Sequence, residues 1–184
     1  GHVVKGVIFN VVEEIVTEHL SLATWDHIVT NARVDGAYTS LGTYDDADLD
    51  RIVASAGRVL NLTGDEVLRF VGTHAFARLA ERVPEVMAPM DGWRTVLSDL
   101  DQVIHVEVKK LYPDAMVPTF VASVDGDGIL LCYRSARRLC ALAEGLAVGA
   151  GRWFGTELAV TQVACVRDGA GECRLTVREA ADAG

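Results

Sequence analysis

One histidine, His105, lies within an apolar run of a long helical pattern. Its neighbours Val103, Ile104 and Val106 are apolar, so the imidazole is expected in an apolar wall. Neutral imidazole in such a wall suits axial ligation of a haem iron, because a porphyrin requires one strong protein ligand and an apolar slot. A core histidine bonded to a backbone carbonyl is the alternative. A catalytic zinc ion would require two further histidines or carboxylates nearby, and none is obvious.

Three polar side chains alternate at the junction of a predicted strand and a predicted helix. In extended backbone alternate side chains point the same way, so Tyr133, Ser135 and Arg137 are expected to converge. A phenol, a hydroxyl and a guanidinium on one side form a donor-rich site for a carboxylate, and a helix N-terminus would add backbone N–H groups. A capped helix start with a solvated arginine is the alternative interpretation.

Charge and composition exclude several classes of protein. The 184 residues include 17 Lys plus Arg against 26 Asp plus Glu, a formal net charge of −9. The densest basic cluster, Arg134, Arg137 and Arg138, is too small for nucleic-acid binding. No segment reaches the roughly 18 apolar residues of a membrane span, and Val7–Val16 carries too many polar residues for a signal peptide. The sequence therefore indicates a cytosolic ligand-binding or partner-binding protein, or a small enzyme.

Common catalytic patterns are absent from the sequence. It contains no Gly-x-Ser-x-Gly, no phosphate-binding loop ending in Lys-Ser/Thr and no His-Glu-x-x-His. The clustered carboxylates of Asp45, Asp46, Asp48 and Asp50 are interpreted as the start of a helix and its solvated face. These absences weaken the hydrolase and transferase interpretations.

The spacing of apolar residues changes from helical to extended after Pro113. Before it, period-3.6 patterns predict helices, one of which opens with a capping box at Thr63-x-x-Glu66. After it, alternating segments joined by Asp-Gly turns predict hairpins, so the class is α+β with a four-stranded antiparallel sheet. The predicted helices are Val7–Leu20, Thr24–Ala32, Leu49–Leu60, Thr63–Phe76, Asp91–Tyr112 and Ser135–Trp153. The predicted strands are Pro118–Val124, Gly128–Tyr133, Thr156–Val166 and Cys173–Val177.

The chain length predicts one domain over residues 1–184. We expect a helical subdomain over about 5–62 and a second subdomain over about 63–178. Residues 1–3 and 180–184 are interpreted as a tag and a tail.

Three segments in the same order carry a resemblance to a known family. They are Lys5–Asn10, the stretch His105–Pro113 followed by Pro118, and Tyr133-x-Ser135-x-Arg137. With them the chain resembles, from about Lys5 to Val177, the haem-nitric-oxide/oxygen-binding (H-NOX) domains, bacterial relatives of the haem domain of soluble guanylate cyclase.

The resemblance implies haem b held between a helical lobe and a C-terminal lobe. His105 matches the proximal iron ligand, and the Tyr-x-Ser-x-Arg side chains match the trio that binds the propionates. Ile8 and Pro118 match apolar residues that press on the porphyrin. Nitric oxide would bind ferrous iron and weaken or break the bond to His105. A separate signalling partner, such as a histidine kinase or a cyclic-dinucleotide enzyme, would read the relaxation that follows.

The resemblance also implies an apolar pocket on the ligand side of the haem. Leu142 stands where oxygen-binding relatives have a tyrosine, and the other polar positions correspond to Val12 and Ala75. Leu146 is expected to line the same pocket, which favours nitric oxide and carbon monoxide over dioxygen. His74 is the one nearby donor that could contradict this.

Four cysteines leave three states open. Cys165 and Cys173 flank the second hairpin turn, so their thiols are expected to face each other, although a cytosolic chain keeps thiols reduced. Some relatives bind zinc with three cysteines and a histidine. Cys140, Cys165 and Cys173 match those cysteines, while Gln162 replaces the histidine. Zinc, reduced thiols and a disulfide remain alternatives.

Our first expectation is a non-catalytic haem sensor of nitric oxide. An enzyme with haem-dependent nitrite or peroxide chemistry is the second, although such cleavage requires a distal acid. A haem-free small-ligand-binding domain on the same scaffold is the third.

Overall fold

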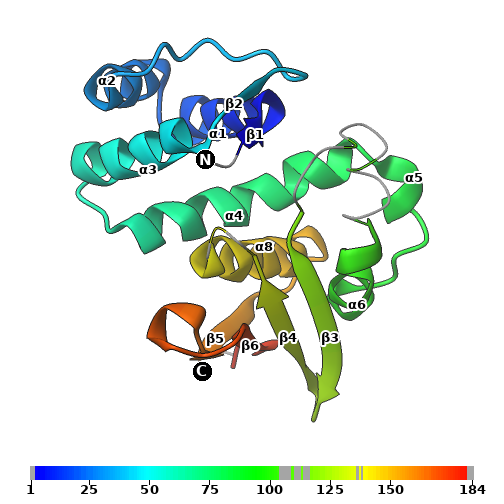
Figure 1. Ribbon diagram of the computed structural model, residues 1–184. Coiled ribbons are helices and arrows are strands. Elements are labelled where there is room, and N and C mark those ends of the chain that lie inside the picture. Colours follow the sequence, from blue (N-terminus) through cyan, green and yellow to red (C-terminus); the bar gives the residue numbers. More distant parts are fainter. Residues whose placement is uncertain are drawn as a thin grey trace. The chain divides into compact units, whose positions relative to one another are not determined.

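The structure is a computed structural model that describes residues 3–103, 109, 113, 117–135, 137 and 139–181 (Figure 1). The chain divides into two compact units, Gly1–Val71 and Gly72–Gly184. Among the described residues no helix is both long enough and apolar enough to cross a bilayer.

The first unit consists of helices and one small antiparallel sheet. Its core comes from buried apolar side chains of three helices, with Phe9, Ile28 and Ile52 at most 1% exposed. The helical predictions over this part are confirmed, because each helix buries one apolar face. The elements are β1 (Val3–Lys5), α1 (Gly6–His19), α2 (Leu22–Ala32), β2 (Thr43–Asp45), α3 (Asp46–Leu60) and the first part of α4 (Gly64–Glu81).

Side chains at the helix starts determine where these helices begin. The Thr63 N–H donates to Glu66 Oε2 at 2.8 Å, and the Glu66 N–H donates to Thr63 Oγ1 at 3.1 Å, so the predicted capping box is confirmed. At α3 the Ala47 N–H donates to Asp45 Oδ1 at 3.0 Å. The acidic cluster therefore caps this helix, as predicted.

The second unit packs helices on one face of a four-stranded antiparallel sheet. The strands lie in the order β3-β4-β6-β5, which confirms the α+β class. The hairpin between β3 and β4 turns at Gly126 (φ 62°), and Asp125 pairs with Gly128 as predicted. The further elements are α5 (Pro84–Met87), α6 (Trp93–Val103), β3 (Thr119–Asp125), β4 (Gly128–Arg134), α8 (Cys140–Trp153), β5 (Leu158–Ala164), a 3-10 turn (Val166–Asp168) and β6 (Cys173–Glu179).

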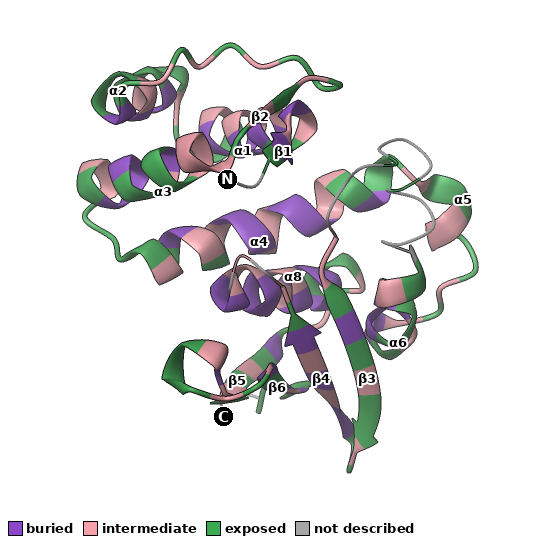
Figure 2. Cartoon of the chain, viewed as in Figure 1, coloured by how far each residue is buried: buried purple, intermediate pink, exposed green. Residues whose placement is uncertain are grey.

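Among the described helices of this unit α8 is largely buried, as Figure 2 shows. The helix carries small residues at most of its buried positions, including Ala143, Ala147 and Ala150. They pack with α6 and with the inward side chains of the strands in one hydrophobic core. Along β3 and β6 buried side chains alternate with more exposed ones, as is typical of a sheet that packs on a core with one face and meets solvent with the other.

Two helices of the second unit have other bounds than predicted. The helix predicted to start at Ser135 begins at Cys140 instead, so that prediction was wrong. The Ser135 hydroxyl accepts a backbone N–H two residues on, which stabilises a turn in place of a first helical turn. The helix predicted over Asp91–Tyr112 is described as α6 from Trp93 to Val103, and most of its remainder lies outside the described residues.

Within the second unit α4 crosses α8 at very short range. A Cβ added at Gly72 would lie 2.4 Å from the Leu142 carbonyl oxygen and 2.9 Å from the Leu146 nitrogen. A Cβ at Gly149 would lie 2.5 Å from the Thr73 carbonyl oxygen. Backbone atoms cannot rotate away, so these two glycines fix how closely the helices approach.

We predict that Gly72→Ala lowers the free energy of unfolding by about 1–2 kcal/mol. Alanine gains up to about 1 kcal/mol of helix propensity, but overpacking costs about 1–3 kcal/mol and exceeds that gain. Urea unfolding measures the difference. Gly64→Ala in the same helix is the control, since nothing lies within 4 Å of its added Cβ. Equal stability of the two variants would show that the close crossing is not a packing constraint.

Candidate functional site

Strand β4 places Tyr133, the first member of the predicted polar trio, near its C-terminal end. Tyr133 is 4% exposed and packs against Phe120 with ring centroids 5.2 Å apart. Burial raises the pKa of the Tyr133 phenol, while hydrogen bonding to Ser135 and to the backbone of Leu139 and the charge of Arg137 act in the opposite direction. The phenol thus remains a neutral donor near neutral pH.

A short turn after β4 holds the other two members of the trio. The Arg137 N–H donates to Ser135 Oγ at 3.2 Å, and both residues are half-buried. The structure therefore brings together the phenol, the hydroxyl and the guanidinium that the alternation predicted. The α8 N-terminus starts three residues beyond Arg137, and its N-cap residue Leu139 contributes a backbone hydrogen bond to the Tyr133 phenol.

The structure describes some of the residues that the resemblance assigns to the haem and leaves His105 out. His105 lies outside the described residues, two positions after the last described residue of α6. Pro118 is half-buried directly before β3. In the first unit Ile8 is 41% exposed on α1, whereas Val12 is buried.

The apolar residues predicted on the ligand side of the haem lie on two helices of the second unit, α8 and α4. Leu142 and Leu146 are half-buried and one turn apart on α8, so they share a face. Their backbone is the part of α8 that Gly72 of α4 approaches. Ala75 is buried on α4, and His74 beside it is half-buried.

Three of the four cysteines form one buried cluster. A disulfide joins Cys140 and Cys173, and Cys165 Sγ lies 3.7 Å from Cys140 Sγ and 3.9 Å from Cys173 Sγ. Cys165 and Cys173 face each other as expected, but the disulfide partner is Cys140. The three sulfurs all lie within 4.8 Å of one another, close enough to share a metal ion. Zinc binds thiolates, however, so this state, in which Cys140 and Cys173 are joined, does not support the zinc alternative.

The fourth cysteine, Cys132, lies apart from this cluster on β4. It is half-buried and is not joined to another cysteine. Burial raises the pKa of its thiol, and the nearby Glu172 carboxylate raises it further. The thiol is therefore less reactive than an ordinary surface cysteine.

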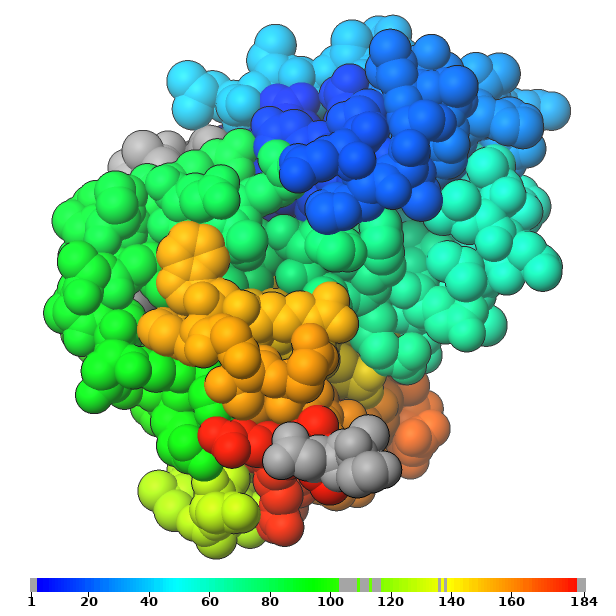
Figure 3. Space-filling model, turned by 180° about the vertical axis from the view of Figure 1, so that it is seen from behind, coloured from blue at the N-terminus to red at the C-terminus, as the bar shows by residue number. Residues whose placement is uncertain are grey.

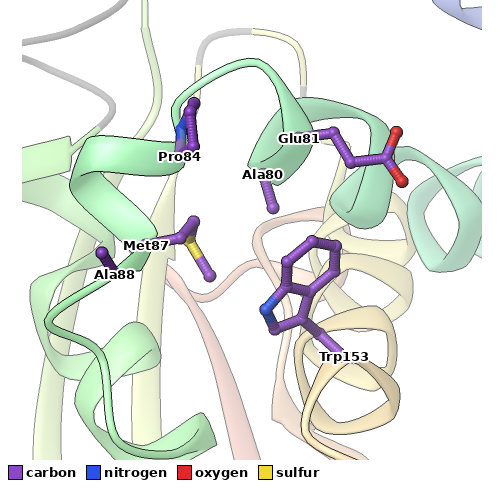
Figure 4. Close-up of a pocket in the computed structure, with 6 residues that line it drawn as sticks. All are labelled: Ala80, Glu81, Pro84, Met87, Ala88 and Trp153. Carbon is purple, nitrogen blue, oxygen red and sulfur yellow. The ribbon is translucent and has the colours of Figure 1, made fainter.

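A shallow groove of the second unit is separate from the predicted site. Its volume is 440 Å³, and Figure 4 shows Trp153 and Met87 facing it from α8 and α5. The end of α8 and the loop after it reach the surface of this unit, in orange in Figure 3. None of the predicted cofactor-binding residues lines the groove, whose lining is Ala80, Glu81, Pro84, Met87, Ala88 and Trp153.

Comparison with known proteins identifies the family. The family model described as Haem-NO-binding matches residues 5–162, and the chain belongs to this family. Its members are haem-binding sensor domains rather than enzymes.

Solved structures of H-NOX proteins have the same fold. The Shewanella oneidensis H-NOX protein in the Fe(II)NO ligation state is 31% identical, with TM-score 0.86 over 97% of this chain and 100% of that chain. The H-NOX domain of the same organism in the Fe(II)CO state has TM-score 0.85 at 31% identity and the same coverage. The Fe(II) unliganded H-NOX protein from K. algicida has TM-score 0.83 at 25% identity, over 98% of this chain and 99% of that chain.

The described residues of the second unit fit one feature of a haem. A porphyrin has two carboxylates on an otherwise apolar disc, and the trio at and just after the end of β4 supplies neutral and charged donors to a carboxylate.

Two residues that bear on this site were not predicted from the sequence. Gly72 interrupts a strongly helical segment, and an isolated glycine inside a helix is itself a signal of a close approach. Asp101 accepts the Phe120 N–H at 2.8 Å. This hydrogen bond joins residues 19 positions apart, and the local spacing of residue types does not predict such a pair.

We predict that Arg137→Ala weakens haem binding by about tenfold or more. A hydrogen bond to a charged group contributes roughly 1.5–3 kcal/mol, and about 1.4 kcal/mol is one decade in affinity. The measurement is the rate of haem transfer to an excess of an apo-globin acceptor.

Arg134→Ala is the matched control, because it removes the same charge. Arg134 is exposed and pairs with Glu172 at 3.0 Å, away from the trio. If both variants lose haem at the same rate, Arg137 acts only through its charge, and the prediction of a specific propionate site at the trio is wrong.

Proposed function

We propose that this protein is a haem-based nitric oxide sensor that signals to a separate partner protein. The observation that carries the proposal is the convergence of Tyr133, Ser135 and Arg137 at the end of β4 in a chain of the Haem-NO-binding family. The trio would hold the propionates of haem b, and His105 would be the protein ligand to its iron. Haem, when bound, supplies the ferrous iron at which nitric oxide and carbon monoxide bind.

Apolar side chains support a preference for nitric oxide and carbon monoxide over dioxygen. Bound dioxygen gathers negative charge on its outer atom, so it requires a hydrogen-bond donor, whereas nitric oxide binds ferrous haem strongly without one. Leu142, Leu146 and Ala75 offer no side-chain donor. The same lack of a distal acid argues against nitrite or peroxide cleavage as the activity.

Signal output would occur through another protein. Residues of the chain would hold the haem, and His105, as the proposed ligand, would link its iron to the segment that follows the described part of α6. Solved H-NOX structures of Shewanella oneidensis in the Fe(II)NO and Fe(II)CO states support these ligands for this chain. The partner would be of the class of a histidine kinase or a cyclic-dinucleotide enzyme.

We expect His105→Gly to lose normal haem retention and free imidazole to restore it. The glycine leaves a gap that imidazole fills as an untethered ligand. Absorption spectra of the ferrous protein, with and without imidazole, measure both effects. His27→Ala on the exposed face of α2 is the control for loss of a histidine. If iron ligation in His105→Gly matches that of the unmodified protein, the proposed ligand is wrong.

The ferrous protein in air is expected to show no long-lived oxygenated spectrum. Leu142→Tyr should lengthen the lifetime of that spectrum, because a phenol O–H can donate to bound dioxygen, and Leu142→Phe should not. Stopped-flow absorption after mixing with aerated buffer measures the lifetimes. A stable oxygenated spectrum of the unmodified protein would instead identify His74 as a donor.

A further inference from the structure

The two edges of the four-stranded sheet differ in how they are covered. The strand order is β3-β4-β6-β5, so β3 and β5 are the edge strands (Figure 1). Helix α6 packs beside β3, and Asp101 Oδ1 on this helix accepts the Phe120 N–H of β3 at 2.8 Å. Among the described residues no hydrogen bond from another element reaches the outward backbone groups of β5. Strand β5 is therefore the open edge of the sheet.

The hydrogen-bond pattern of β5 determines which of its backbone groups face outward. Just before the strand, the Ala180 N–H donates to the Glu157 carbonyl oxygen at 2.9 Å, so these two residues form a hydrogen-bonded pair. Such pairs alternate with non-hydrogen-bonded pairs along an antiparallel ladder, so the backbone groups of Ala159 and Thr161 also point toward β6. The residues whose N–H and C=O groups point away from β6 are therefore Leu158, Val160 and Gln162.

The exposure of side chains along β5 agrees with an open edge. Val160 packs toward the core but is only half-buried, whereas its ladder partner Val177 on β6 is 0% exposed. On the solvent face Ala159 and Thr161 are exposed. The strand Leu158–Ala164 contains no charged residue and no proline. Natural edge strands commonly carry such residues because they prevent pairing with another chain, so β5 lacks this protection.

We propose that β5 is a self-association edge, at which two copies of this chain join their sheets by antiparallel β5–β5 pairing. The inference goes beyond the proposed function and does not depend on haem. A β-bulge between Gln162 and Ala164 ends the regular part of the edge, which leaves Leu158–Gln162 for pairing. The register that pairs this whole segment with itself places Val160 on the two-fold axis, opposite the same residue of the partner.

In this register the two edges complement each other. The outward residues meet as hydrogen-bonded pairs, because Val160 faces itself and Leu158 faces the partner's Gln162. On the solvent face Ala159 lies opposite the partner's Thr161. Strand β5 brings no charged side chain to the contact, although each chain has a formal net charge of −9. A hydrogen bond contributes about 0.5–1.5 kcal/mol net, so this short contact gives weak, concentration-dependent association.

The geometry also limits the assembly to two copies. A two-fold axis occupies the same edge of both copies, so the joined sheet ends at a β3 strand on each side. There α6 packs beside the edge and Asp101 accepts one of its N–H groups. We therefore expect a closed dimer with one continuous sheet, and no growth into an open array.

Sedimentation equilibrium of the intact chain from about 1 μM to about 1 mM tests the proposal over the range of weak association. The weight-average mass should rise from 19.8 kDa toward twice that value. Thr161→Lys should lower the association constant by about tenfold or more, because it places a charge in the middle of the pairing edge of each copy.

Ser123→Lys is the matched control, because it adds the same charge at an exposed position of the other edge strand, β3. It should keep the association constant of the unmodified protein. A mass of 19.8 kDa at every concentration would overturn the proposal, and so would equal weakening by the two substitutions.

Disulfide cross-linking tests the register and captures a weak dimer. Across a non-hydrogen-bonded antiparallel pair the Cα atoms lie about 4.5 Å apart, which a disulfide can span. In a Cys132→Ser background, Ala159→Cys mixed with Thr161→Cys should give a covalent dimer under mild oxidation, visible on a non-reducing gel. Ser123→Cys mixed with Thr161→Cys is the control and should stay monomeric. Equal cross-linking in both mixtures, or none in either, would contradict β5–β5 pairing.

Discussion

Close packing around helix α8 is the constraint on which the C-terminal unit depends. Its buried positions are mostly alanine and glycine, so neighbouring backbones approach to distances that leave no room for a Cβ at Gly72, Gly149 or Gly151. Each small residue buries little apolar area, but close approach adds dispersion contacts along the whole helix. This arrangement leaves α8 little freedom to slide or rotate, because backbone atoms form the contact.

The positions of the site residues follow from that packing. The start of α8 brings Cys140 to the first residue of β6, and the next turn presents Leu142 beside α4. Directly upstream, the chain leaves β4 through the turn that Ser135 stabilises, so the polar trio lies between the sheet and the helix in sequence. The polar and the apolar groups of the proposed site thus come from two adjacent segments, the end of β4 with its turn and the start of α8. The close backbone contacts of α8 therefore constrain the positions of both segments.

Sequence patterns predicted the parts of this fold that depend on local chemistry. The capping box at Thr63 and the Asp-Gly hairpin at residue 126 depend on neighbours within a few positions, and both are observed. Strands β1 and β2 were missed, since three residues are too few to show alternation. The Cys140 disulfide and the Asp101 contact join residues 33 and 19 positions apart, and only tertiary packing determines such pairs.

For the site itself, alternation predicts that Tyr133, Ser135 and Arg137 converge. The structure shows a hydrogen bond between Tyr133 and Ser135, although β4 ends at Arg134 and the alternation of a strand stops there. The helix start was misplaced for a related reason. Ser135 competes for backbone N–H groups, and the turn it forms delays α8 until Cys140. That delay leaves Arg137 in a turn rather than in a helix, and the contact of its backbone N–H with Ser135 fixes the backbone from which the guanidinium extends. The departure from the predicted helix is thus part of how the chain places a charged donor next to a buried phenol.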